Sequence, residues 1–173
     1  MPGSAFFICR ARSREGDSSQ IVSFSNCLIR KRHESALSKY RGRHLASNVT
    51  VRETNVSNWA DTQYFVTLYL GSQRTALKFI LDTGSSWFWV PSALCTTCQN
   101  SKFNGTLSKS IANSTNVQNV FYSLGFVSGT LATDTVSLLS NGSSNATGVQ
   151  FLLVKSASNL SAMVADGILG LSA

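Results

Sequence analysis

From position 63 onward the sequence predicts an all-β fold. Short runs of apolar and β-branched residues alternate there with Gly, Ser and Asn, and almost none of them has the helical period of about 3.6 residues. Beyond the first residues of the chain, proline occurs only at Pro91. With 173 residues, 43% of them hydrophobic, the chain is long enough for one ordinary domain with a buried core and an extension.

Three strands are predicted in the first part of this region. Residues 64–70 form an apolar and aromatic run that ends at a Gly-Ser pair. Residues 76–81 form a second run that leads directly into Asp82, and residues 87–90 form a third run that Pro91 ends. Each run is short and bounded by turn residues, which is typical of strands.

The second part of the region predicts a loop, a hairpin and three more strands. Residues 92–116 are expected to form a loop with surface turns. A hairpin is expected over 120–131, with a Ser-Leu-Gly-Phe turn at its centre. Strands over 134–139 and 149–154 bracket a turn rich in Ser, Asn and Gly, and the last apolar run is 166–171.

Residues 1–61 are predicted to be a basic extension, and residues 62–173 the folded domain. Ten of the 15 Lys and Arg residues and five of the 8 acidic residues lie in the extension, so it carries +5 of the net charge of +7. This composition favours a partly disordered segment, with a weak helical pattern over 29–45. Nucleic-acid binding by residues 10–43 is the least supported hypothesis, because no DNA-binding or RNA-binding motif accompanies the charge.

The sequence favours the secretory route, with an extracellular or a lysosomal or vacuolar destination. Seven Asn-X-Ser/Thr sequons fit a glycoprotein, although a chain rich in Ser and Asn also forms sequons by chance. They begin at Asn48, Asn55, Asn104, Asn113, Asn141, Asn145 and Asn159. No clear signal peptide is present, because the apolar run 5–9 is shorter than an h-region of about 7 to 15 residues. No run approaches the roughly 20 apolar residues of a membrane-spanning helix.

Cys95 and Cys98 form a Cys-Thr-Thr-Cys unit that fits half of a zinc site, a redox pair or a tight disulfide. Zinc would need two further ligands at a matching spacing, whereas both histidines lie in the basic extension. A short structural disulfide is therefore favoured, and no metal site is predicted. The other two cysteines, Cys9 and Cys27, lie in the extension and indicate no role.

Asp82 is the residue with the clearest chemical context. It ends an apolar run and is followed at once by Thr83, Gly84 and two serines. Neighbouring hydroxyls and a glycine that lets backbone N–H groups approach can hold a carboxylate ionised and let it orient a water molecule. The residues alone also fit an ordinary turn or a helix N-cap, because Asp-Thr-Gly-Ser is common turn chemistry.

Residues 79–92, Phe-Ile-Leu-Asp-Thr-Gly-Ser-Ser-Trp-Phe-Trp-Val-Pro-Ser, resemble the first active-site loop of the pepsin family of aspartic endopeptidases. Three landmarks appear in the family's order: an opening strand from Tyr64, a flap hairpin over 122–136, and the apolar-apolar-Gly segment within 166–171. The resemblance covers residues 63–173. It implies the all-β N-terminal lobe of a bilobal enzyme that cleaves peptides or proteins without a metal or an organic cofactor.

The resemblance assigns roles to four residues of the loop. Asp82 would be one member of the catalytic pair that shares a proton and activates a water molecule. Ser85 would donate a hydrogen bond to its outer oxygen, and Gly84 would supply a backbone N–H. Thr83 would help to lock the loops of the two lobes together.

The resemblance also implies a substrate-binding flap. Tyr122 would lie above the substrate with its hydroxyl near the indole of Trp89, and Gly125 would contact the substrate backbone near the flap tip. Considered singly, the two aromatic residues equally fit core or cross-strand packing. The sequence departs from the family at Trp87, where Asn is frequent, and at a Ser-Leu pair in the flap turn, so the pocket shape differs. Cys95 and Cys98 match the position of the family's small disulfide loop.

The chemistry requires two carboxylates, because only a pair can keep one proton between them and serve as base and acid in one cycle. Asp134 and Asp166 do not lie in Asp-Thr-Gly or Asp-Ser-Gly motifs and match structural positions of the family. We therefore expect the second aspartate in a C-terminal lobe that this sequence lacks, and a chain that is inactive alone. A symmetric homodimer ranks lower, and a non-catalytic peptide-binding glycoprotein is the alternative function.

The extension resembles the propeptide of the family. Residues 27–32, Cys-Leu-Ile-Arg-Lys-Arg, precede a second basic stretch. Cations near an ionised carboxylate pair would favour the charged form and occupy the cleft, which is a physical route to a zymogen activated by acid. Lys39 or Arg41 is the expected occluding cation.

Overall fold

The computed structural model describes residues 5–8, 28–31, 54–123 and 125–172. In this part of the chain nearly all regular structure is β-strand, and a 3-10 turn over Gly105–Leu107 is the one helical element. The predicted all-β fold is therefore confirmed.

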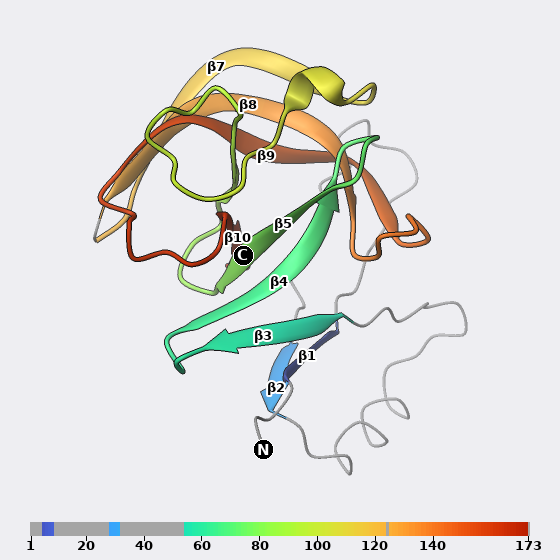
Figure 1. The fold of residues 1–173 in the computed structure, drawn as a ribbon, viewed down its shortest axis with the longest axis vertical. Helices are drawn as coiled ribbons and strands as arrows, with labels where there is room; N and C mark the ends of the chain where they lie inside the picture. Colours follow the sequence, from blue (N-terminus) through green and yellow to red (C-terminus); the bar gives the residue numbers. More distant parts are fainter. Residues whose placement is uncertain (1–4, 9–27, 32–53, 124, 173) are drawn as a thin grey trace.

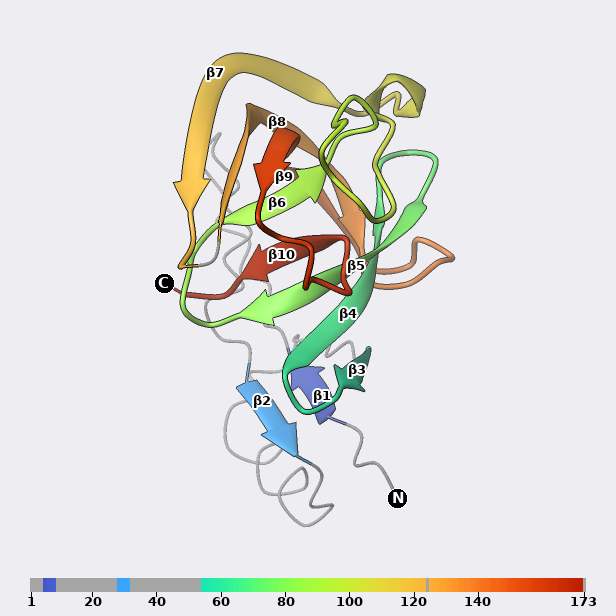
Figure 2. The same ribbon diagram turned by 60° about the vertical axis from the view of Figure 1, so that its left-hand side comes forward.

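Ten strands form a single sheet in the order β2-β1-β3-β4-β5-β10-β6-β9-β8-β7 (Figure 1). An additional pairing joins β4 to β8, so the sheet curls back on itself and encloses the core, as the turned view shows (Figure 2). The strands are β1 (Ala5–Ile8), β2 (Leu28–Lys31), β3 (Asn55–Trp59), β4 (Gln63–Leu70), β5 (Thr75–Asp82), β6 (Phe88–Pro91), β7 (Ala112–Phe121), β8 (Phe126–Ser137), β9 (Asn145–Ser158) and β10 (Gly167–Gly170).

The strands β4, β5, β6 and β10 lie where the sequence predicted strands. Two predictions were wrong in detail. The loop predicted over 92–116 ends earlier, because β7 begins at Ala112. The separate strands predicted around 127–131 and 134–139 belong to one strand, β8, which has register shifts at Gly129 and between Asp134 and Val136.

Three strands, β1, β2 and β3, lie in the predicted extension and join the sheet. β3 pairs with β4, with Val56 opposite Val66, and β1 pairs with both β3 and β2. Leu28–Lys31 is a strand at the point where a weak helical pattern was predicted to begin. The remainder of that predicted helix, residues 32–45, lies outside the described residues.

The core follows from the two-residue period of the strands. Val66, Leu68 and Leu70 of β4 are buried at every second position, which places them on the inner face of the curled sheet. An aromatic cluster fills the space opposite them. Phe88 lies edge-on to Phe151, and Phe151 lies edge-on to Phe103, with ring centroids 5.7 and 6.2 Å apart.

We predict that Phe151→Ala lowers the free energy of unfolding by about 3 to 5 kcal/mol, because it leaves a cavity between two aromatic rings. Phe151 is 1% exposed, whereas Phe121 is 77% exposed. Phe121→Ala, the matched control, should change the free energy of unfolding by about 0.5 kcal/mol or less. Urea unfolding followed by circular dichroism measures both values, and similar losses would contradict the assigned core.

Candidate active site

Asp82 is positioned by the parallel pairing of β10 with the end of β5. Gly170 lies opposite Asp82 in the register, and the Leu171 N–H donates to the Asp82 carbonyl oxygen at 2.7 Å. The Gly170 N–H donates to the Trp87 carbonyl at 3.0 Å, and the Ser172 N–H donates to that of Ser85 at 3.0 Å. The loop after Asp82 is therefore joined by backbone hydrogen bonds to the last apolar segment of the chain.

The carboxylate of Asp82 is half-buried and has two donors. The Gly84 N–H donates to Oδ1 at 2.8 Å, and the Ser85 hydroxyl donates to Oδ2 at 2.5 Å. These hydrogen bonds fix the orientation of both carboxylate oxygens. The two contacts expected of Gly84 and Ser85 are present, while the catalytic role of Asp82 stays a prediction. Thr83 is exposed, and its predicted role between two lobes also stays a prediction.

The predicted flap is the turn that joins β7 to β8. Tyr122 and Gly125 exchange backbone hydrogen bonds of 2.8 and 3.3 Å, and Phe121 pairs with Phe126 one step further from the turn. A Cβ on Gly125 would lie 2.0 Å from the carbonyl oxygen of Ser158, so a larger residue would push β9 away. The glycine thus lets the flap pack against the end of β9.

The structure brings Tyr122 together with Trp89 and with the Asp82 loop. The indole N–H of Trp89 donates to the Tyr122 hydroxyl at 3.0 Å. Burial raises the pKa of Tyr122, and the charge of Asp82 raises it further, while contacts with Trp89 and Ser85 lower it. The phenol therefore stays neutral at acidic and neutral pH, near enough to Asp82 to sense its charge.

The other two carboxylates of the predicted folded domain serve the structure. Asp166 accepts from the N–H groups of Lys78 and Ser101, at 2.7 and 2.9 Å. Asp134 is 1% exposed and accepts through Oδ1 from the Ser110 hydroxyl at 2.6 Å. Its Oδ2 atom is buried and has no hydrogen-bond partner among the residues that the structure describes. Neither residue lies in the loop that holds Asp82.

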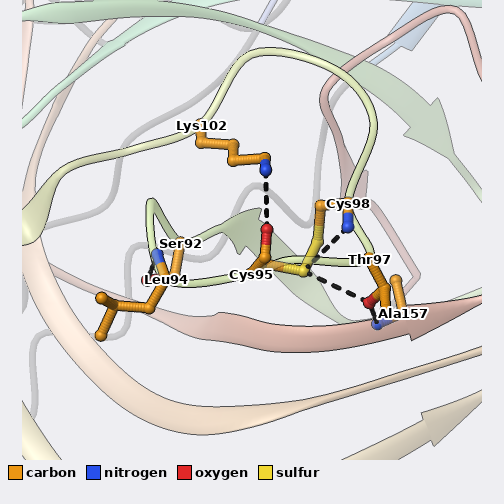
Figure 3. Close-up of a disulfide and its surroundings, with 7 residues drawn as sticks. All are labelled: Ser92, Leu94, Cys95, Thr97, Cys98, Lys102 and Ala157. Atoms are coloured by element: carbon orange, nitrogen blue, oxygen red, sulfur yellow. Dashed lines mark hydrogen bonds between the residues drawn. A yellow bond between two sulfur atoms is a disulfide. The ribbon is translucent and has the colours of Figure 1, made fainter.

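Cys95 and Cys98 form a disulfide with a Cα–Cα distance of 5.5 Å, so in this state neither sulfur is a thiolate that could bind zinc (Figure 3). The Lys102 ammonium donates to the Cys95 carbonyl at 2.7 Å, and the Thr97 hydroxyl accepts from the Ala157 N–H at 2.8 Å. The disulfide loop is thereby tied to β9. Cys9 and Cys27 lie outside the described residues.

Within the described part of the chain, no group of three or more His, Cys, Asp or Glu side chains is placed to hold a metal ion. The same residues include no helix that is long and apolar enough to cross a membrane.

Residues 63–173 match the family model described as eukaryotic aspartyl protease. The chain belongs to this family. Pepsin II-2/3 of Oryctolagus cuniculus is 34% identical over 128 residues, which are 71% of this chain and 32% of that protein. Chymosin of Callithrix jacchus is 34% identical over 113 residues, 64% of this chain and 29% of that protein. Syncephapepsin of Syncephalastrum racemosum is 35% identical over 113 residues, 64% of this chain and 28% of that protein.

This aspartyl protease chain thus spans about a third of the length of the curated relatives that it matches. The family assigned from the Asp-Thr-Gly-Ser loop, the flap and the closing Gly-Ile-Leu-Gly segment is confirmed. Sequence motifs did not point to Gln63 or Asn100. Both make hydrogen bonds to the segment before β10, and a single amide residue has no recognisable pattern around it.

We predict that one tyrosine of this aspartyl protease chain, Tyr122, loses its proton at higher pH than an ordinary phenol. Titration of tyrosinate absorbance should show a late step that is missing in Tyr122→Phe. Asp82→Asn should move the step to lower pH, because it removes a negative charge that raises the pKa. A titration unchanged by Asp82→Asn would contradict the proximity of the two groups.

The same shift affects stability. Since the phenol of the unfolded chain loses its proton first, near pH 10, the Tyr122 contribution is complete below that pH and is lost as the pH rises through the higher pKa of the folded state. Tyr122→Phe should therefore show a shallower loss of stability than the wild type in this alkaline range.

Proposed function

We propose that this protein is an aspartic endopeptidase in which Asp82 is one of two catalytic carboxylates. The observation that carries the proposal is the pair of donors on Asp82, the Gly84 N–H and the Ser85 hydroxyl, beside a flap that carries Tyr122. The second carboxylate would come from a C-terminal lobe outside this chain. Coverage of 32% of a pepsin supports that requirement.

In the proposed reaction, a water molecule lies between Asp82 and its partner carboxylate. One carboxylate takes a proton from the water molecule while the water oxygen attacks the peptide carbonyl carbon. The other carboxylate, which is already protonated, donates its proton to the carbonyl oxygen. The resulting tetrahedral species then collapses, the C–N bond breaks, and a proton passes to the leaving amine. Two carboxylates close together can share one proton, which makes this division of roles feasible.

The neighbours of Asp82 would support this cycle in distinct ways. Gly84 and Ser85 hold the carboxylate oxygens so that its charge and orientation are set before substrate binds. The neutral phenol of Tyr122, oriented by Trp89, would lie over the bound peptide, and Gly125 would approach its backbone. Thr83 would contact the loop of the second lobe.

The remaining expectations concern how the protein is made. We propose that residues 1–61 act as a propeptide that keeps a zymogen inactive through Lys39 or Arg41, and that residues 62–173 form the N-terminal lobe. The disulfide, which forms under oxidising conditions, supports a secretory route and occupied sequons. Substrates would be extended peptides or proteins.

We predict that Asp82→Asn lowers peptide hydrolysis at acidic pH by at least about a hundredfold, because an amide cannot take the proton from water. The measurement uses the longest natural protein that contains these residues and a fluorogenic peptide mixture. Asn116→Asp is the control, because Asn116 is an exposed side chain of β7 outside the proposed propeptide. It should keep the wild-type rate.

Hydrolysis that survives Asp82→Asn would refute the proposed role. Peptide binding without any hydrolysis by the wild type would favour the alternative, a non-catalytic peptide-binding glycoprotein.

A further inference from the structure

The segment 159–165, which connects β9 to β10, has no regular backbone structure. Asn159 begins it with a positive φ of 57°, and the one backbone hydrogen bond within it joins the Met163 N–H to the Leu160 carbonyl at 3.1 Å. An irregular segment of this kind needs other partners to take one conformation, because its peptide groups are not paired by a strand or a helix.

Two side-chain amides, from the start of β4 and from the residues after the disulfide loop, supply those partners. Gln63, at the start of β4, donates through Nε2 to the Ala162 carbonyl at 2.9 Å and accepts through Oε1 from the Val164 N–H at 3.1 Å. Asn100, beyond the disulfide loop, donates through Nδ2 to the carbonyls of Met163 and Ala165, at 3.0 and 2.7 Å. Four consecutive residues therefore each have one backbone group held by an amide.

The segment is one wall of a cavity of about 290 Å³. Trp89, Leu160 and Met163 are among its apolar lining residues, polar residues such as Gln99 and Ser161 make up the rest, and Thr97 and Cys98 of the disulfide loop also line it. Trp89 connects this cavity to the flap, because its indole N–H donates to Tyr122. The Thr97 bond to Ala157 holds the disulfide loop to β9 (Figure 3). A shift of segment 159–165 would therefore change the width of the cavity.

We propose that Gln63 and Asn100 are positioning residues that fix this wall and thereby determine which peptide side chain the cavity accepts. The inference rests on the proposed peptide substrate. Gln63 suits the task because a primary amide donates and accepts at once, as the Ala162 and Val164 groups require. Asn100 uses only the donor side of its amide, because its Nδ2 group donates to two carbonyl oxygens. An altered wall would change selectivity while leaving Asp82 and its two donors in place.

The first test measures the wall directly, by amide hydrogen exchange of Val164 in the full chain. Gln63→Met, which removes both hydrogen bonds, should accelerate exchange on the order of tenfold at every pH. Gln63→Glu keeps the acceptor for Val164. The ionised carboxylate of this variant cannot donate to Ala162, but the protonated acid can. The exchange of the Val164 amide in Gln63→Glu should therefore return to the wild-type value below about pH 4. Unchanged exchange in Gln63→Met would overturn the proposal.

The second test measures selectivity with two peptides that differ only in one side chain, leucine or alanine, bound to the Asp82→Asn form. Gln63→Met and Asn100→Asp should each change the ratio of the two dissociation constants about fivefold or more. Gln150→Glu and Asn116→Asp are matched controls. These amides are exposed and have no side-chain hydrogen bond within the described residues, so they should leave the ratio unchanged.

The two proposals fail separately in this design. Binding to the Asp82→Asn form requires no turnover, so an inactive wild type would refute the endopeptidase while the ratio is still measured. An unchanged ratio in both Gln63→Met and Asn100→Asp, or no binding of either peptide, would overturn the selectivity role of Gln63 and Asn100. In an active wild type, the same variants should change KM for the leucine peptide more than kcat.

Discussion

The close approach of β10 to the loop after β5 is the constraint on which the candidate site depends. A Cβ on Gly170 would lie 2.5 Å from the Trp87 nitrogen, and one on Gly167 would lie 2.4 Å from the Trp89 carbonyl oxygen. Glycine at both positions allows the backbones to meet and exchange the hydrogen bonds that hold the loop. The Gly-Ile-Leu-Gly segment is therefore as much a part of the site as Asp82, although it contributes no reactive side chain.

Three aspartates of the domain have different roles because their surroundings differ. Each carboxylate oxygen of Asp166 accepts a hydrogen bond from a backbone N–H. These bonds join the start of β10 to β5 and to the residues after the disulfide loop. Asp134 is buried with a hydroxyl donor and one oxygen without a hydrogen-bond partner among the described residues, at the register shift of β8. Asp82 alone combines two fixed donors with a half-buried position beside the flap, which leaves it accessible to a water molecule and a peptide.

The parts of the structure that were predictable are those with a local physical signal. Apolar residues alternate with polar ones or follow one another in β4 and β5, and these strands end before a glycine and at Asp82. The loop after β5 consists mostly of residues that are typical of turns. Most of β7 was not predicted, because its residues from Asn113 to Asn119 are mostly polar and exposed at a sheet edge. The amides of Gln63 and Asn100 could not be found in advance, because their partners lie 99 and 63 residues away and are backbone groups, which any residue provides.

The hydrogen bonds of Asp82 and Tyr122 described above join residues of this chain. The proposed reaction also requires a second carboxylate, because a lone one can take a proton from water but has no protonated neighbour to polarise the peptide carbonyl. Under the proposed function, peptide recognition by the flap side and peptide hydrolysis are therefore separable properties, since the first uses residues of this chain and the second also uses the partner carboxylate.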